Sequence, residues 1–129
     1  MIVGIGVDIV DIERVARMYE KYRDRFTSRV FTDGETAYAL KSIKPAERFA
    51  GRFAVKEAVL KAFGTGKSHG ILWRDVETVR GKMGRPEVIL HGNAHKYMKR
   101  LNGNNVLVSI SHDHGKAVAF VVIEGAGEK

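Results

Sequence analysis

The sequence lacks cysteine altogether, has no internal repeat and contains no long apolar run. Without cysteine, the chain has neither a disulfide framework nor thiol chemistry. No apolar run approaches the roughly 20 residues that a membrane-spanning helix needs, and the first residues carry no basic segment of the kind that opens a signal peptide. We therefore expect a soluble cytoplasmic protein without a membrane-spanning segment.

The chain has the composition of one globular domain with an excess of positive charge. Its 129 residues are 44% hydrophobic, which suits a single folded unit over residues 1–129. The formal net charge is +7 and the sequence pI is about 9.8. This excess of positive charge predicts an anionic partner. The partner could be nucleic acid, a phosphorylated cofactor, an acidic protein or a membrane surface. The positions of the charges must distinguish among them.

An apolar segment, residues 48–66, predicts one long helix that is stopped by glycines. Because it is apolar nearly all round, we expect a core helix rather than a surface helix. Glu57 and Lys61 lie one turn apart on it, and a buried charge is costly unless it is paired or binds a ligand. The two residues form either an ordinary ion pair between neighbouring turns or part of a site. The lack of a clean polar face favours the site.

The first apolar run, residues 2–10, predicts a buried strand. Alternation places Val3, Ile5, Val7 and Ile9 on one face and Gly4, Gly6 and Asp8 on the other. Glycine inside a strand marks the close approach of a ligand or of another backbone. Because Asp11 is the better N-cap for the helix that follows, Asp8 is left without a structural role.

Residues 11–26 predict a helix whose charges are sorted onto separate faces. One face is apolar, a second is acidic and a third is basic. The basic face, which we call the basic stripe, consists of Arg14, Arg17, Met18, Lys21 and Arg25. A charged face is commonly just solvated, but an adaptable methionine ringed by cations suits docking onto an acidic helix. Nucleic acid fits less well, because no aromatic side chain is interleaved on this face for base stacking.

The remaining segments predict short helices and antiparallel strands. Thr32 and Glu35 match a capping box that starts a helix through Leu40, and Pro45 suits the first turn of the core helix. Residues 73–80 and 87–90 alternate as a hairpin, residues 91–101 form a helix, residues 106–111 and 116–123 form strands around a turn, and residues 125–129 fray. The expected fold class is α+β, with a small antiparallel sheet packed with a long core helix and shorter helices.

Asp8 and Glu57 are the two carboxylates without a structural role. Two converging carboxylates, together with phosphate oxygens, are how proteins hold Mg²⁺, which keeps several of its waters. Lys61 can meet a phosphate as a point charge, and Arg52 and His112 are further donors. These residues point to metal-assisted phosphoryl chemistry on a small phosphorylated ligand, with an acidic protein docked on the basic stripe.

Three segments resemble the signatures of the 4'-phosphopantetheinyl transferases. They are Gly6-Val7-Asp8, Phe53-Ala54-Val55-Lys56-Glu57-Ala58-Val59-Leu60-Lys61-Ala62 and Ser109-Ile110-Ser111-His112-Asp113. The chain length, Gly64-Thr65-Gly66 and Gly84-Arg85-Pro86 point to the short bacterial type, and the resemblance covers nearly the whole chain. It implies the fold of this family and transfer of 4'-phosphopantetheine from coenzyme A to a serine of apo acyl carrier protein for fatty acid biosynthesis. The released product would be adenosine 3',5'-bisphosphate.

The resemblance also implies a role for each matching residue. Asp8 and Glu57 match the Mg²⁺ ligands, and together with Lys61 at the diphosphate they are the implied catalytic residues. The implied coenzyme A contacts are Lys44, Arg52, Lys61, Gly84, Arg85, Pro86 and His112, with Arg52 and His112 near the 3'-phosphate and the turn at residues 84–86 beside the adenine. The basic stripe matches the helix on which the acidic carrier protein docks. The serine is deprotonated either by Glu57 or by a metal-bound water.

Short members of the family form homotrimers with active sites between subunits, and the resemblance implies the same assembly here. It implies neither nucleic acid nor a membrane as a partner. Asp113 follows His112 where some members have threonine, and it is left out of the site because an acid would not bind a 3'-phosphate. Two alternatives explain less. A nucleic-acid-binding domain fits the net charge, but Asp8 and Glu57 would repel a phosphate backbone unless a metal intervened. A structural adaptor for an acidic partner explains the basic stripe but not Asp8, Glu57 and Lys61.

Overall fold

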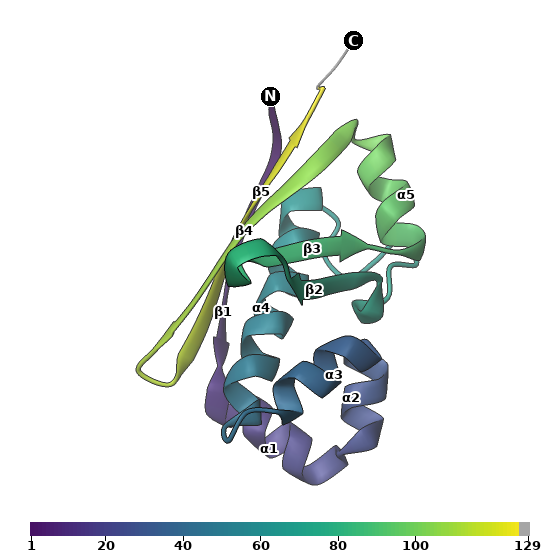
Figure 1. Cartoon of the computed structure of the whole chain (residues 1–129). Coiled ribbons are helices and arrows are strands. Elements are labelled where there is room, and N and C mark those ends of the chain that lie inside the picture. Colours follow the sequence, from purple (N-terminus) through teal and green to yellow (C-terminus); the bar gives the residue numbers. More distant parts are fainter. Residues whose placement is uncertain (127–129) are drawn as a thin grey trace.

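A computed structural model describes residues 1–126, in which helices pack on one side of a three-stranded sheet beside a separate hairpin (Figure 1). The elements in order are β1 (Ile2–Asp11), α1 (Ile12–Tyr22), α2 (Asp24–Val30), α3 (Asp33–Leu40), α4 (Pro45–Phe63), η1 (Trp73–Asp75), β2 (Val76–Arg80), η2 (Lys82–Gly84), β3 (Pro86–Leu90), α5 (Gly92–Arg100), β4 (Gly103–Asp113) and β5 (Lys116–Gly125). The sheet is antiparallel with the order β1-β5-β4, and β2 pairs with β3. The predicted α+β fold class is confirmed.

The long helix α4 is the centre of the fold. Pro45 occupies its first turn, and Gly64 ends it in the left-handed region with φ of 80°. Figure 1 shows α1, α2 and α3 gathered at one end of α4, with α5 and the β2–β3 hairpin toward the other. Most of its side chains are buried, including Phe49, Val55 and Val59. The predicted core helix is confirmed, although it begins at Pro45 and ends at Phe63.

Strand β1 lies against α4 through its two glycines. A Cβ added at Gly6 would lie 2.0 Å from the carbonyl oxygen of Ala58, and one at Gly4 would lie 2.3 Å from the carbonyl oxygen of Ala62. Of the two explanations for these glycines, the structure therefore supports the close approach of another backbone. Because side chains alternate along a strand, the same face carries Asp8 onto α4.

We expect Gly6→Ala to destabilise the fold by about 3 kcal/mol, because a rigid backbone carbonyl occupies the place of the new methyl group. Urea denaturation measures the loss. Gly34→Ala is the control, since its methyl group would meet only side-chain oxygens, that of Glu77 at 3.2 Å and that of Thr32 at 3.9 Å. Equal stabilities of the two variants would contradict the close packing of β1 on α4.

The single helix predicted for residues 11–26 is wrong beyond Tyr22. There α1 ends, Arg23 adopts φ of 45° and ψ of −120°, and α2 follows. The change of direction brings the ring of Phe26 to 5.6 Å from that of Phe31 and 6.4 Å from that of Phe49. These aromatic contacts favour the bend over a straight helix. The sequence periodicity of α1 could not reveal them, because Phe31 and Phe49 lie outside it.

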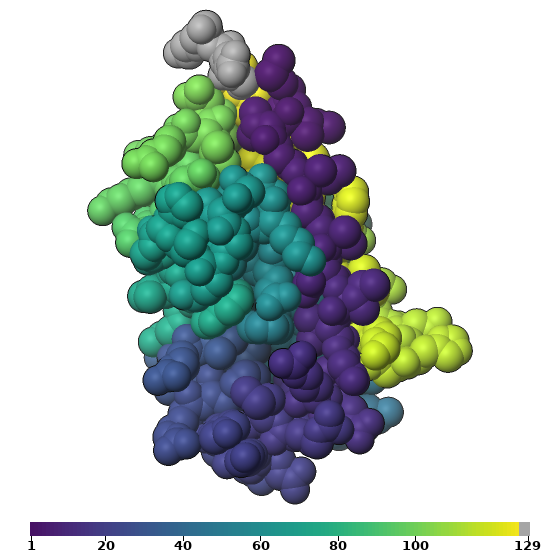
Figure 2. All heavy atoms as spheres, turned by 180° about the vertical axis from the view of Figure 1, so that it is seen from behind, coloured from purple at the N-terminus to yellow at the C-terminus, as the bar shows by residue number. Residues whose placement is uncertain are grey.

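The strand predicted to be buried is buried on one face only. Ile5, Val7 and Ile9 of β1 are 59%, 49% and 64% exposed, and Phe120 and Leu107, which share their face by register, are 44% and 48% exposed. We call this exposed apolar surface of β1, β5 and β4 the outer sheet face. Figure 2 shows β1, in purple, running along the back of the molecule with parts of β5, in yellow, beside it. Nothing within the described chain covers this surface.

Other boundaries also differ from those predicted. Residues 73–75 form a short 3-10 turn instead of the start of a strand, because the side chain of Asp75 accepts the backbone N–H of Leu72 at 2.9 Å. Strand β4 runs on to Asp113, so His112 lies in a strand rather than a turn. Gly125 ends β5 rather than fraying, and residues 127–129 lie outside the described residues. Among the described residues, no helix is long and apolar enough to span a membrane.

Candidate functional site

The three predicted catalytic residues meet where β1 crosses α4. Asp8 is buried, and its Oδ1 accepts a hydrogen bond from Lys61 Nζ at 2.9 Å. Lys61 also donates to the carbonyl of Val7 at 3.2 Å. Glu57 lies close enough to Asp8 for the Asp8 carboxyl group to raise the pKa of Glu57. Lys61 therefore pairs with Asp8 on another element, and the ordinary ion pair with Glu57 on its own helix is not formed.

The environment of Glu57 disfavours its charged form. The pKa of Glu57 rises to about 7, first because the group is partly buried, then through its hydrogen bond to Asp8 and repulsion by Asp8, while Lys61 and Arg14 act in the opposite direction. Oδ2 of Asp8 is buried and has no hydrogen-bond partner among the described residues. An unsatisfied carboxylate oxygen beside a second carboxylate suits a hard divalent cation with oxygen ligands. Asp8 and Glu57 thus fit Mg²⁺.

The raised pKa predicts a stability that depends on pH in the absence of metal. The pKa of Glu57 is about 7 in the folded state against 4.5 as a model value, so the folded state holds the proton more tightly. The contribution of Glu57 to the free energy of unfolding is therefore largest below pH 4.5, and it is lost as the pH rises through about 7. Between pH 5 and 8 in EDTA, the wild type should lose about 1 kcal/mol relative to Glu57→Gln, allowing for solvent screening. Urea denaturation at both pH values measures this, and parallel losses in the two proteins would contradict it.

The basic stripe is divided by the break at Arg23. Its members on α1 are Arg14, Arg17, Met18 and Lys21, and Arg25 lies on α2. A hollow of about 210 Å³ beside Glu57 is lined by Arg14 and Met18. Met18 and Arg25 also line a larger hollow of about 910 Å³. Although the stripe is not one straight helix face, it borders the carboxylate pair.

Four of the residues implied to bind coenzyme A line a separate cavity of about 450 Å³. They are Arg52, Gly84, Pro86 and His112. This cavity, which we call the arginine cavity, shares no lining residue with the hollow beside Glu57. Lys44 does not line it, lying instead just before α4 as its N-cap residue. The structure therefore gathers four of the predicted coenzyme A contacts in one cavity, but does not bring them to Asp8, Glu57 and Lys61 within one chain.

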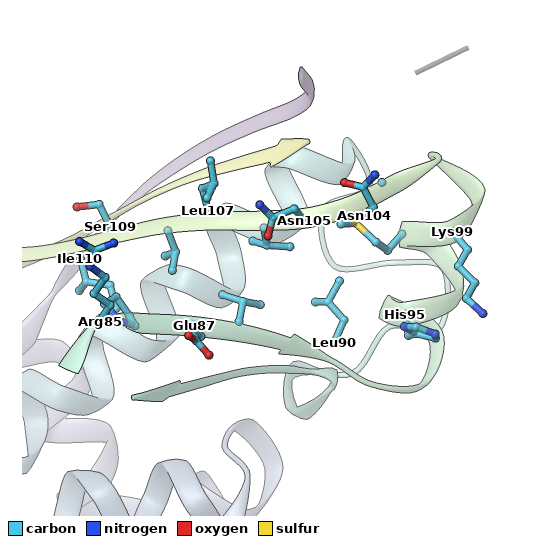
Figure 3. Close-up of a pocket in the computed structure, with 16 residues that line it drawn as sticks. Arg85, Glu87, Leu90, His95, Lys99, Asn104, Asn105, Leu107, Ser109 and Ile110 are labelled. Atoms are coloured by element: carbon cyan, nitrogen blue, oxygen red, sulfur yellow. The ribbon is translucent and has the colours of Figure 1, made fainter. Parts of the chain in front are cut away.

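Arg85 lines a groove of about 850 Å³ between β3, β4 and α5 instead. In Figure 3, Arg85 lies at the end of this groove beside Ile110, while His95 and Lys99 of α5 lie at the other end. Pro86 and Ile110 line both the groove and the arginine cavity. The turn predicted to lie beside the adenine is thus situated where these two hollows meet.

Sequence reasoning missed the aromatic residue and two of the arginines in the wall of the arginine cavity. Tyr38, Arg48 and Arg80 line it together with the predicted residues. The sequence offered one signal for Arg48, because it lies one helical turn before Arg52 and carries the same charge. No local pattern identifies Tyr38 or Arg80, because they come from α3 and from the end of β2.

It also missed Lys56, the residue next to Glu57. Lys56 is fully buried and donates to Glu35 Oε1 at 2.7 Å, to the carbonyl of Trp73 at 3.0 Å and to the carbonyl of Val76. Burial lowers the pKa of Lys56, and Glu35 opposes this effect. Glu35 also completes the predicted capping box with Thr32, which is confirmed. The sequence did contain a signal for the burial of Lys56. A helix that is apolar nearly all round has little exposed surface on which a lysine side chain could lie.

The chain is similar to one group of proteins by sequence and by structure. Residues 4–121 match the family model of the 4'-phosphopantetheinyl transferase superfamily. A holo-[acyl-carrier-protein] synthase from Solibacter usitatus is 43% identical over 124 residues, covering 96% of this chain and 99% of the relative. The crystal structure of holo-[acyl-carrier-protein] synthase from Neisseria meningitidis superposes with a TM-score of 0.87 at 34% identity, covering 96% of this chain and 99% of that one. The enzyme from Bacillus anthracis, in complex with CoA (3',5'-ADP), has a TM-score of 0.79 at 36% identity, covering 98% and 99%.

Proposed function

Because the chain belongs to the 4'-phosphopantetheinyl transferase superfamily, among the holo-[acyl-carrier-protein] synthases, we propose the following reaction and cofactor. The enzyme moves 4'-phosphopantetheine from coenzyme A to a serine hydroxyl of apo acyl carrier protein, with Mg²⁺, and releases adenosine 3',5'-bisphosphate. It acts in the cytoplasm and serves fatty acid biosynthesis. The observation that carries the proposal is the unsatisfied, buried Oδ2 of Asp8 beside Glu57, whose pKa is about 7.

In this proposal, each residue of the chain has a role that follows from its position. Asp8 and Glu57 hold the metal ion, which when bound stabilises negative charge on the diphosphate. Lys61 adds a second positive charge at the diphosphate, because its largely exposed ammonium retains a donor beyond those to Asp8 and Val7. The residues of the arginine cavity bind the nucleotide end of coenzyme A, with Lys44 and Arg85 at its margins.

We also propose a homotrimer with active sites between subunits. Two features of the single chain support it. The arginine cavity and the carboxylate pair lie in separate hollows, so one coenzyme A that contacts both is best accommodated between two copies. The outer sheet face exposes a contiguous set of large apolar side chains, as subunit interfaces do. Light scattering tests the assembly, with an expected mass three times the 14.4 kDa of one chain.

Mass spectrometry of the carrier protein tests the reaction directly. Apo acyl carrier protein is incubated with the enzyme, coenzyme A and Mg²⁺, and a parallel sample contains EDTA. We expect one phosphopantetheine group to be added only where the metal is available. A carrier protein whose mass does not change in the presence of Mg²⁺ would refute the proposed function, and equal addition in EDTA would refute the role of the metal.

Charge reversal tests the basic stripe as the docking surface for the acidic carrier protein. Arg17 and Lys21 are exposed and line neither hollow described above, so their loss leaves the carboxylate pair intact. The double variant Arg17→Glu/Lys21→Glu should raise the KM for carrier protein by about tenfold and leave the KM for coenzyme A unchanged. Lys96→Glu/Arg100→Glu on α5 is the matched control. An equal rise in both KM values would show that the stripe is not a docking surface.

A further inference from the structure

Three arginines surround the ring of Tyr38 in the arginine cavity. The guanidinium carbons of Arg52 and Arg48 lie 4.0 and 4.1 Å from the ring centroid, and that of Arg80 lies 5.9 Å away. Arg48 also donates to the carbonyl of Tyr38 at 2.7 Å. A guanidinium within about 6 Å of an aromatic ring is attracted to its face. Tyr38 is therefore a common contact for side chains from α4 and from the end of β2.

No carboxylate is paired with this cluster of positive charge in the described part of the chain. Arg52 is 6% exposed, and its Nε is buried without a hydrogen-bond partner in the described part of the chain. Burial lowers the pKa of Arg52, whereas Tyr38 and Glu35 oppose this effect and repulsion by Arg48 adds to it. Glu47 is the one carboxylate among the described residues of the cavity wall.

Arg80 reaches the cavity because residue 84 has no side chain. A Cβ at Gly84, whose φ is 74°, would lie only 2.6 Å from Nη2 of Arg80. The guanidinium is thus packed between this glycine and the Tyr38 ring. His112 lines the same cavity, so the residues implied to contact the nucleotide and the arginine cluster form one surface. Several guanidinium groups on one wall can bind a phosphate through paired, charge-assisted hydrogen bonds.

We propose that Tyr38 is a positioning residue that holds Arg48, Arg52 and Arg80 as one wall for a phosphomonoester dianion, and that Arg80 determines specificity for a nucleotide carrying a 3'-phosphate. This inference rests on the proposed function, which supplies such a nucleotide as substrate. The resemblance implied Arg52 and His112 at this position. Tyr38 and Arg80 are added by the geometry of the cavity.

Calorimetry on the full-length protein tests the role of Arg80. The probes are adenosine 3',5'-bisphosphate and adenosine 5'-monophosphate, which lacks the 3'-phosphate. The wild type should bind the bisphosphate at least about tenfold more tightly, and Arg80→Met should reduce this ratio by about tenfold while the affinity for the monophosphate stays within about twofold. Arg100→Met is the matched control, because it removes an arginine that lies 5.7 Å from the Tyr97 ring, outside this cavity.

Two substitutions of Tyr38 separate its ring from its hydroxyl group. Tyr38→Phe keeps the ring and should bind the bisphosphate within about twofold of the wild type, whereas Tyr38→Leu should lose about fivefold or more. Unchanged thermal unfolding of both variants shows that the effect is local. Bisphosphate affinity equal to the wild type in Tyr38→Leu would overturn the positioning role. If the ratio of bisphosphate to monophosphate affinity in Arg80→Met is no lower than in Arg100→Met, the specificity role of Arg80 is overturned.

These measurements are independent of phosphopantetheine transfer. If the wild type adds no phosphopantetheine to the carrier protein, the proposed function fails, and the ratio of bisphosphate to monophosphate affinity still decides whether the arginine wall recognises the 3'-phosphate. If transfer occurs and the ratio does not respond to Arg80→Met, only the arginine wall is refuted.

Discussion

Glu57→Gln is expected to lower the rate of phosphopantetheine transfer by on the order of a hundredfold or more. Glutamine has nearly the same shape but no negative charge, so it cannot join Asp8 in neutralising a divalent cation. The side chain lies at the partly buried contact between β1 and α4, where the packing is otherwise unchanged by this substitution. Mass spectrometry of the carrier protein gives the rate, and light scattering checks that the assembly persists.

A second measurement identifies the metal role of Glu57 without relying on activity. Mg²⁺ should raise the unfolding temperature of the wild type at pH 8, because an ion that binds only the folded state stabilises it. The shift should be much smaller at pH 6, where the proton competes with the ion for Glu57, and should be nearly absent in Glu57→Gln. Glu20→Gln, at an exposed position of α1, is the control. Near wild-type transfer by Glu57→Gln would contradict the metal assignment.

Lys56→Met is expected to destabilise the enzyme by about 3 to 5 kcal/mol, because it leaves the carboxylate of Glu35 buried without its cation. Both side chains are fully inaccessible to solvent, and the ammonium of Lys56 also satisfies the carbonyls of Trp73 and Val76. The pair joins α3 to α4 beside the turn that carries Glu57. Urea denaturation measures the loss, and part of it should appear as a lower affinity for Mg²⁺.

A double-mutant cycle separates the ion pair from the packing around it. The double variant Lys56→Met/Glu35→Gln should lose less free energy of unfolding than the two single variants together, by more than about 1 kcal/mol. The reason is that the double variant leaves no buried charge unpaired. Glutamine at position 35 can still accept the backbone N–H of Thr78, which Glu35 Oε2 accepts at 3.0 Å. The exposed pair Arg17–Glu13 is the control, with an expected coupling below about 0.5 kcal/mol. If the losses in free energy of unfolding at Lys56 and Glu35 are additive, the ion pair between them does not stabilise the fold.

The sequence alone determined the features that depend on short stretches of chain. Pro45 and Gly64 mark the two ends of α4, and Thr32 with Glu35 forms the predicted capping box. Such signals are reliable because each involves backbone groups within one or two turns. Asp8 and Glu57 were selected as carboxylates without a local role, and the structure brings them together. The three signature segments also identified the family, since they preserve the local chemistry of the site.

The tertiary structure decided the features that depend on partners distant in sequence. Arg23 breaks the first helix where aromatic contacts to Phe31 and Phe49 favour a bend, and Lys56 finds Glu35 on another helix. The cluster on Tyr38 draws one of its arginines from the end of β2. It was also the structure that left the outer sheet face uncovered and placed the arginine cavity apart from the carboxylate pair. Sequence periodicity and capping residues determine which side chains share a face of a helix or strand. Packing between elements distant in sequence determines which residues that face contacts.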